Sequence, residues 1–112
     1  MLDYDFKFKK GILFIRLKGD VIKKTSKLLD EKIDPLVLEN GISNVVFNVS
    51  KLNTIDKYGL LAFYKTYLKL NKKSDISLCE IPKFLRKKFK FLLKHIKERE
   101  DEYTILTKSW VN

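Results

Sequence analysis

The residues whose types and spacing suggest a specific chemistry lie together in the segment Asp56-Lys57-Tyr58-Gly59. Asp56 separates an apolar, β-branched segment from a segment with helical periodicity, so it occupies the position of a helix N-cap. A carboxylate at an N-cap accepts hydrogen bonds from amide groups of the first turn and stabilises the helix by about 1 kcal/mol. Lys57 and Tyr58 then project toward solvent, where tyrosine often contributes strongly to protein interfaces.

This turn is therefore a candidate surface for contact with a protein partner. Asp56 either only caps the helix or also contacts the partner, and Gly59 either relieves crowding in the first turn or lets the partner approach the backbone. The predicted partner-binding residues are Asn53, Thr54, Asp56, Lys57, Tyr58, Gly59 and Phe63.

Catalytic chemistry finds little support in the sequence. His95, the only histidine, stands among lysines and is interpreted as a surface residue, and Cys79, the only cysteine, lies in an apolar segment where a buried, inert thiol is expected. The sequence contains no P-loop, no Rossmann glycine pattern, no Gly-x-Ser-x-Gly motif and no set of metal ligands. We therefore expect no enzymatic activity, no cofactor and no metal.

The net charge of +10 suggests an anionic partner, but the positive residues are 21 lysines and only 3 arginines. Readout of bases and bidentate phosphate contacts favour arginine, so nucleic-acid binding is the less favoured interpretation. One basic, amphipathic helix is expected after Pro82, with Phe84, Leu85, Phe89, Leu92 and Ile96 inward. Its lysines either form a solvated face or contact an anionic surface. The candidate contact residues are Lys83, Arg86, Lys87, Lys90 and Lys94.

The length of 112 residues fits one domain, and 45% hydrophobic residues in periodic blocks favour a folded chain. No apolar run approaches the roughly 18 residues that span a bilayer, and the N-terminus lacks the basic-then-apolar order of a signal peptide. A cytoplasmic location is expected. Trp110 is expected to dock on the domain's own surface from a short tail, residues 108–112.

The order of periodic segments predicts an α/β fold. Alternation over 4–9 and an apolar segment over 12–17, on either side of Lys9-Lys10-Gly11, indicate a hairpin, and Gly19-Asp20 is expected to end its second strand. A helix follows from Thr25, with a kink or break near Asp34 because Pro35 disfavours helix there, and Gly41 is expected to end the segment. Strands are then expected at 45–49, 76–79 and 103–107, and a helix after Asp56 with an inward stripe. That stripe consists of Leu60, Leu61, Tyr64, Tyr67 and Leu68. Strands connected through helices imply a largely parallel sheet.

This order resembles the STAS domain, the fold of bacterial anti-sigma factor antagonists and of modules in lipid-transport and anion-transport systems. The resemblance rests on GILFIRLKGD, VVFNVSKLNTIDKYGLLAFYKTY and DISLCEIPKFLRKKF, and it covers residues 4–107. It implies a single STAS-like domain with a mixed sheet of about five strands, an N-terminal antiparallel hairpin, and helices packed against the sheet.

Phosphorylated members of that family carry Asp-Ser-Ser-Gly or Asp-Ser-Thr-Gly at the strand-to-helix turn, and a partner kinase modifies the second hydroxyl residue. Here Lys57 and Tyr58 replace both hydroxyl residues. Two further positions differ: Asn48 stands where the family commonly has aspartate, and Ile22 where it has an acidic residue. A phosphoserine would add about −1.5 to −2 charges at this surface, and that switch is absent here.

The resemblance implies a non-catalytic module that binds a regulatory partner, plausibly a kinase-like anti-sigma factor in bacterial transcription regulation, through residues 53–63. An alternative of a different class is a STAS-like accessory subunit of a lipid transporter or another membrane-associated assembly, with the basic surface facing phospholipid headgroups. A second alternative is a basic nucleic-acid-binding domain. The sequence leaves the oligomeric state open.

Overall fold

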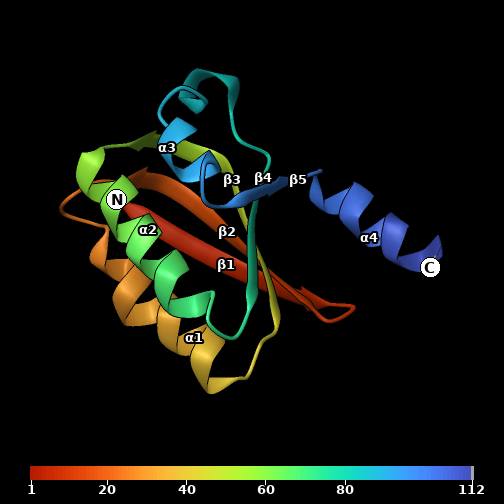
Figure 1. Cartoon of the computed structure of the whole chain (residues 1–112). Helices are drawn as coiled ribbons and strands as arrows, with labels where there is room; N and C mark the ends of the chain where they lie inside the picture. The colour runs from red at the N-terminus through yellow and green to blue at the C-terminus, as the bar shows by residue number, and fades with distance from the viewer. Residues whose placement is uncertain (112) are drawn as a thin grey trace.

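Five strands form one mixed sheet in the order β1-β2-β3-β4-β5 (Figure 1). The computed structural model describes the backbone of residues 1–111 and the side chains of residues 1–108. β1 (Leu2–Lys9) pairs antiparallel with β2 (Ile12–Val21), and every other pair is parallel. β3 (Asn44–Ile55), β4 (Asp75–Cys79) and β5 (Lys97–Arg99) follow across the sheet. The predicted α/β fold with an N-terminal hairpin is confirmed.

The hairpin turn forms where the sequence predicts it. Lys10 and Gly11 both have positive φ angles, +55° and +79°, as a tight turn between right-twisted strands requires. β2 continues past Gly19 to Val21, although Gly19-Asp20 was expected to end it, because irregular pairing near Gly19 lets β2 follow the long strand β3.

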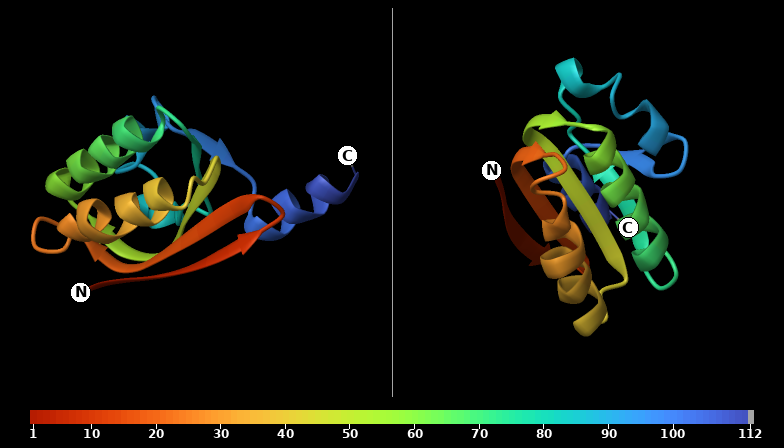
Figure 2. Two further views of the ribbon diagram at one scale, coloured as in Figure 1. Left: turned by 90° about the horizontal axis from the view of Figure 1, so that it is seen from below. Right: turned by 90° about the vertical axis from the view of Figure 1, so that its left-hand side faces the viewer.

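Two helical segments lie side by side in one layer over one face of the sheet (Figure 2). The first consists of a π-helical turn, Leu29–Ile33, followed by α1 (Asp34–Glu39). The chain stays helical through Asp34, whose φ and ψ angles are −57° and −48°, so no break occurs there; the irregularity near Pro35 is the π-helical turn that precedes it. The second is α2 (Lys57–Leu70), which packs beside α1.

The inward stripe predicted for α2 is wrong in part. Leu61 and Leu68 are 49% and 48% exposed, whereas Gly59, Phe63, Thr66 and Leu70 are buried. Two of these four residues are small, so the helix approaches the sheet closely through positions that an apolar pattern does not mark. The exposed leucines form part of the outer face of α2 instead.

The segment after β4 differs most from expectation. Instead of one long basic helix, the chain forms a 3₁₀ turn, Lys83–Leu85, and the one-turn helix α3 (Lys90–Leu93). Like charges spaced three or four residues apart repel each other, and neither segment has a side-chain cap. Leu85, Phe89, Leu92 and Ile96 are buried as predicted, but Phe84 is 69% exposed.

The closing strand lies at Lys97–Arg99, and the residues predicted as a strand, 103–107, belong to α4 (Glu102–Val111). Asp101 starts this helix, because its carboxylate accepts a hydrogen bond from the amide of Thr104 at 2.8 Å. The helix includes residues 108–111 of the expected tail. The predicted docking of Trp110 concerns a side chain that lies outside the described residues.

The two faces of the sheet have cores of very different size. The face under α1 and α2 holds the main core, including Leu17, Phe47 and Phe63. On the back face a small cluster forms around Ile105 of α4, which packs with Ile12, Phe14, Val46 and Cys79. Figures 1 and 2 show α4 leaving the sheet beyond β5, on the side away from α1 and α2. None of the described helices is long and apolar enough to cross a bilayer.

Candidate functional site

Asp56 connects the start of α2 to the end of β2 through hydrogen bonds. One carboxylate oxygen accepts a hydrogen bond from the amide of Gly59 at 2.8 Å, and the other accepts one from the amide of Lys23 at 3.2 Å. The amide of Asp56 donates to the carbonyl of Val21 at 3.2 Å. The N-cap predicted for Asp56 is therefore present, and its second oxygen also orders the loop that follows β2.

Gly59 is required by close packing inside the protein. A Cβ atom at this position would lie 2.0 Å from the carbonyl oxygen of Val21 and 2.8 Å from its carbonyl carbon. Such a contact requires the backbone to move. Gly59 is buried, so its role is to let α2 approach β2 and not to offer backbone to a partner.

The exposed side chains at this helix start are basic and aromatic. Tyr58 is 43% exposed, and the ammonium groups of Lys23 and Lys57 lie 5.0 and 5.3 Å from the centre of its ring. Cations at this distance are attracted to an aromatic face and hold it in place. Leu61 lies one turn further along α2 and is exposed. We refer to Lys23, Lys57, Tyr58 and Leu61 as the helix-start surface.

Sequence reasoning missed two residues of this surface and included one that is absent from it. Lys23 comes from the loop after β2, and only the tertiary structure brings it to Tyr58. Leu61 could have been found, because residues three apart lie on one helix face. Phe63 was predicted as a contact residue, which is wrong: it is fully buried, and its ring lies 4.9 Å from that of Phe47.

Asn53 and Thr54 lie near the end of β3, just before the helix start. Asn53 is exposed and Thr54 is half-buried, with its hydroxyl 3.5 Å from the ammonium group of Lys88. Both residues therefore border the helix-start surface, as the sequence placed them, and their binding role stays a prediction.

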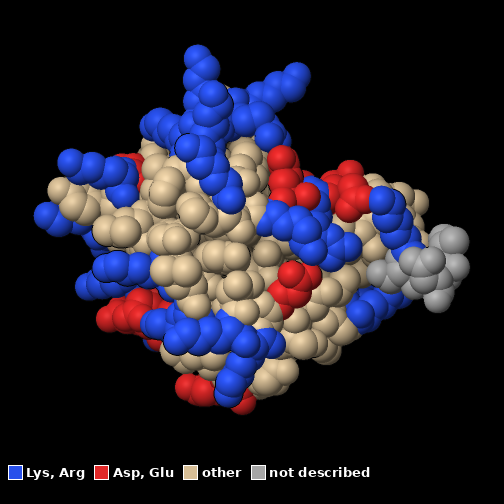
Figure 3. All heavy atoms as spheres, in the orientation of Figure 1, with Lys and Arg blue, Asp and Glu red and all other residues tan. Residues whose placement is uncertain are grey.

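The basic residues around α3 do not share one helical face. Figure 3 shows lysine and arginine side chains gathered over the part of the molecule where Figure 1 places α3. Lys83, Lys87, Lys90 and Lys94 are exposed. Arg86 forms two hydrogen bonds with the carboxylate of Glu98, one of them 3.1 Å long, which lower the pKa of Glu98. Arg86 is thus already paired within the chain, unlike a free contact residue.

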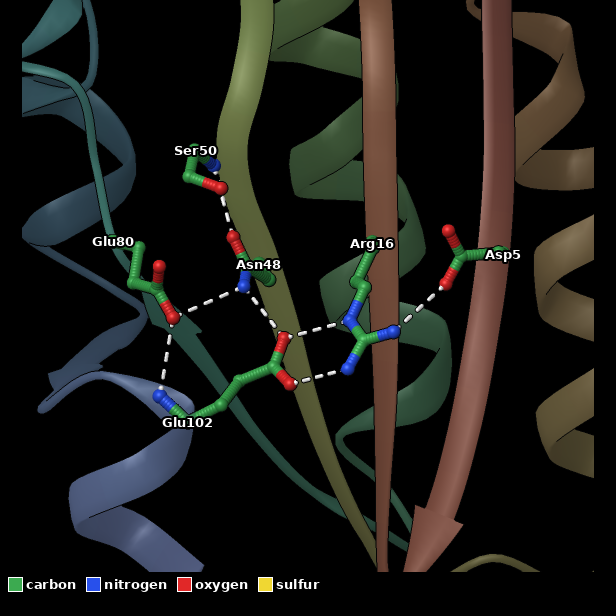
Figure 4. A network of polar contacts seen from close by, with 6 residues as sticks. All are labelled: Asp5, Arg16, Asn48, Ser50, Glu80 and Glu102. Carbon is green, nitrogen blue, oxygen red and sulfur yellow. Dashed lines mark hydrogen bonds and ion pairs between the residues drawn. The ribbon is translucent and has the colours of Figure 1, made fainter.

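A second group of polar residues lies on the back face of the sheet (Figure 4). Glu102, the first residue of α4, accepts hydrogen bonds from the Nη2 and Nε atoms of Arg16 at 2.8 and 3.0 Å and from the amide group of Asn48 at 2.5 Å. Arg16 also pairs with Asp5 at 3.2 Å. Asn48 donates to Glu80 at 3.1 Å. We refer to these five residues as the back-face network.

The back-face network attaches α4 to the sheet. The carboxylate of Glu80 accepts a hydrogen bond from the amide of Glu102 at 3.1 Å, and Glu80 itself has a φ of +57°, which is unfavourable for a residue with a side chain. Burial alone would raise the pKa of Glu102, but the hydrogen bonds from Arg16 and Asn48 outweigh it, and the pKa is lowered. Glu102 is therefore held ionised at neutral pH.

Asn48 has a specific electrostatic task in this network. It is 6% exposed, and its amide group donates to two carboxylates, while its oxygen accepts from the amide of Ser50 at 2.9 Å. An aspartate, which the resemblance suggested as the usual residue here, would place a third carboxylate beside Glu80 and Glu102. Asparagine at this position therefore donates to the carboxylates of Glu80 and Glu102, where an aspartate would repel them.

A hollow of about 620 Å³ opens above the back-face network, and its lining includes Arg16, Asn48, Glu80 and Glu102. These four side chains bond one another, and Asp3, Lys18, Ser50 and Lys51 also line the hollow. The described residues contain no cluster of three or more histidine, cysteine, aspartate or glutamate side chains that could hold a metal ion.

The two residues considered for catalysis differ in their exposure. Cys79 is buried, and burial together with nearby carboxylates raises the pKa of its thiol to about 12, so the thiol stays protonated. His95 is exposed and packs against the rings of Tyr64 and Phe91, at 4.8 and 5.4 Å between ring centres. The predicted burial of Cys79 and the predicted surface position of His95 are confirmed.

Comparison with protein families and solved structures identifies relatives. The family model described as the STAS domain matches residues 3–97. An anti-sigma factor antagonist from Mycobacterium paratuberculosis superimposes with a TM-score of 0.80 at 18% identity, over 97% of this chain and 94% of that one. The anti-sigma factor antagonist SpoIIAA in its unphosphorylated form gives 0.70 at 15% identity, over 95% and 96%. SpoIIAA of Bacillus in its phosphorylated form also matches.

A membrane protein contains the same fold as one of its parts. The murine anion transporter Slc26a9 superimposes with a TM-score of 0.74 at 12% identity, over 95% of this chain and 19% of the transporter. At such low identities these similarities establish the fold and leave the partners of this chain to be inferred from its own surface.

Proposed function

We propose that this chain, which belongs to the STAS domain family, is a non-catalytic interaction module that binds a regulatory protein through the start of α2. The observation that carries the proposal is the helix-start surface. An exposed tyrosine lies between two lysines there, and an exposed leucine follows one turn later. Partly apolar surfaces with an aromatic residue at the centre are typical of protein interfaces.

The chemistry of this surface constrains the partner. Lys23 and Lys57 favour an acidic partner surface, and Tyr58 and Leu61 favour an apolar depression within it. Solved structures of related fold include anti-sigma factor antagonists, so an anti-sigma factor of the kinase-like type is the partner we propose, in transcription regulation.

In this proposed function, phosphorylation of a serine at the start of α2 does not control binding. SpoIIAA has been solved in phosphorylated and unphosphorylated forms, whereas Lys57 and Tyr58 occupy the two positions of this chain where the phosphorylated members of the family carry hydroxyl residues. Binding would then be constitutive or controlled by the partner. Mass spectrometry of the protein from its native cells tests this, and a regulatory phosphoryl group between residues 53 and 63 would contradict it.

The binding test uses two leucines with matched exposure on one helix. Leu61 is 49% exposed near the helix start, and Leu68 is 48% exposed two turns further. Affinity purification from native cells should recover an ATPase-fold regulator with the unmodified chain. Binding of that regulator, measured with purified proteins, should weaken at least about tenfold for Tyr58→Ala and Leu61→Ser and little for Leu68→Ser. Equal loss for both leucine variants would contradict the proposed surface.

A second candidate function is an accessory subunit of a membrane-associated assembly. It is favoured by the match to part of the anion transporter Slc26a9 and by the exposed residues Lys83, Lys87, Lys90 and Lys94. Co-purification with membranes, and salt-sensitive binding to vesicles of acidic phospholipid that falls for Lys87→Gln/Lys90→Gln, would favour this function. Binding of DNA with the same salt sensitivity would favour the nucleic-acid alternative.

A further inference from the structure

β1 is a long, regular strand at an open edge of the sheet. It pairs with β2 without interruption from Leu2 opposite Gly19 to Lys9 opposite Ile12, and the sheet order ends with it. Both views in Figure 2 show β1 as the outermost strand on its side, with no other element beyond it. The opposite edge strand, β5, has only three residues. A long edge strand exposes a row of backbone groups that can pair with another strand.

The side chains of β1 separate into two sets by face. Tyr4, Phe6 and Phe8 alternate along one face, and Phe6 and Phe8 are 53% and 58% exposed. The other face carries two acidic residues followed by two basic residues, all exposed: Asp3, Asp5, Lys7 and Lys9. The strand is therefore acidic in its first half, basic in its second half, and aromatic on the reverse.

We propose that β1 pairs antiparallel with β1 of a second copy of this chain, with the two-fold axis at Phe6. In this register Asp3 lies opposite Lys9 and Asp5 opposite Lys7 of the second copy, so each of these charges meets its opposite. On the other face Tyr4 lies opposite Phe8, and the two Phe6 rings face each other. Opposite charges and aromatic pairs across strands both stabilise a sheet.

The same charges disfavour the neighbouring registers. Residues opposite each other must share a face, so the strands can shift only in steps that keep this condition. A shift in one direction places Asp5 opposite Asp5, and a shift in the other places Lys7 opposite Lys7. The charge pattern of β1 thus favours one symmetric arrangement, in which the same surface is used by both copies.

The expected dimer is weak and reversible. Pairing of one edge strand covers less surface than the 1,200–2,000 Å² of a typical stable interface. The net charge of +10 on each copy opposes association at low salt. The full chain should therefore be monomeric when dilute and form dimers as its concentration rises at about 0.15 M salt. The dimer uses the edge of the sheet and does not depend on the helix-start surface.

Sedimentation equilibrium of charge-swap variants tests the register. Asp3→Lys places lysine opposite Lys9 of the other copy, and Lys9→Asp places aspartate opposite Asp3, so each variant alone should dimerise at least about tenfold more weakly. A mixture of the two variants restores both opposite-charge pairs and should form a heterodimer about as strong as the dimer of the unmodified chain. A mixture that remains monomeric would overturn the proposal.

Cysteine cross-linking provides an independent test. In the proposed register Phe6→Cys lies opposite itself and should form a covalent dimer under mild oxidation. Phe8→Cys lies opposite Tyr4 of the second copy and should not, because the two introduced cysteines are about 14 Å apart along the strand. The native thiol of Cys79 is buried and does not compete. Equal cross-linking of both variants, or a Phe6→Cys chain that stays monomeric at every concentration, would refute the arrangement.

Discussion

The back-face network and the helix-start surface are both rich in charged and polar side chains, yet they use them differently. In the network, Arg16 and Asn48 both donate hydrogen bonds to Glu102, whose side chain is only 13% exposed. At the helix start, only Asp56 is bonded to the chain in this way, and Lys23, Lys57 and Tyr58 face solvent.

This difference shows how to tell a structural polar cluster from a binding surface. Groups that satisfy each other inside a protein are costly to disturb, because removing one leaves another buried without a partner. Exposed groups add little to stability and remain available to another molecule. Substitutions in the network should therefore affect folding, and substitutions at the helix-start surface should affect binding.

The largest expected effect on stability comes from substitution of Gly59, which is buried beneath the helix-start surface. Gly59→Ala places a Cβ atom 2.0 Å from the carbonyl oxygen of Val21, so the free energy of unfolding should fall by about 3 kcal/mol. Urea denaturation measures this change. Lys65→Ala, an exposed position on the same helix, is the control and should change stability by less than about 0.5 kcal/mol.

Asn48→Asp should have the next largest effect. It replaces a donor to two carboxylates by a third carboxylate, and the loss should be about 2–3 kcal/mol at pH 7. The new carboxyl group would have a raised pKa in the folded state, so part of the loss should be recovered as the pH falls toward 5. Asn53→Asp makes the same substitution at an exposed position of β3 and should be nearly neutral. Similar losses for the two variants would contradict the network.

Glu102→Gln should lower the free energy of unfolding by about 1–2 kcal/mol at pH 7, because Arg16 loses its principal carboxylate partner. The loss is limited because the Arg16 side chain is partly exposed and water can solvate its charge. The folded-state pKa of Glu102 lies below its unfolded value, so its contribution is present above about pH 4.5 and disappears as the pH falls below this value. Thermal unfolding of the variant should accordingly depend less on pH between 5 and 3 than that of the unmodified chain. An unchanged pH dependence would count against the role of Glu102.

Tyr58→Ala should have the smallest effect on stability, below about 0.5 kcal/mol, because only the exposed contacts with Lys23 and Lys57 are lost. The same variant should show the strongest loss of partner binding. A variant that loses partner binding but keeps its stability would distinguish the helix-start surface from the back-face network most directly. If Tyr58→Ala lowered the thermal unfolding midpoint as much as Asn48→Asp does, the main role of Tyr58 would be structural and not partner binding.

The fold could be predicted from the sequence where local patterns were strong. The hairpin around Lys10-Gly11 and the cap at Asp56 formed as expected, because each depends on residues within a few positions. The segment after Pro82 was misjudged, since its apolar spacing suits a helix while its closely spaced positive charges oppose one. The run Tyr103–Thr107 was too short to distinguish a strand from a helix.

The candidate site could be predicted only in part, for a related reason. Asp56, Lys57 and Tyr58 are consecutive, and their exposure follows from a helix start. Phe63 was misplaced because which face of α2 lies against the sheet depends on two small residues, Gly59 and Thr66, and not on the apolar pattern. The position of Lys23 beside Tyr58 required the path of the chain after β2.

The amino-acid sequence by itself determined the α/β order, the strand-to-helix turn at Asp56, and the replacement of small hydroxyl residues by Lys57 and Tyr58. Only the tertiary structure decided which face of α2 is exposed, that α4 lies on the back face, and that Arg16, Asn48 and Glu102 meet there. The reason is physical: caps, turns and alternation act over a few residues, whereas contacts between residues 86 positions apart, such as Arg16 and Glu102, depend on how the whole sheet and its helices pack.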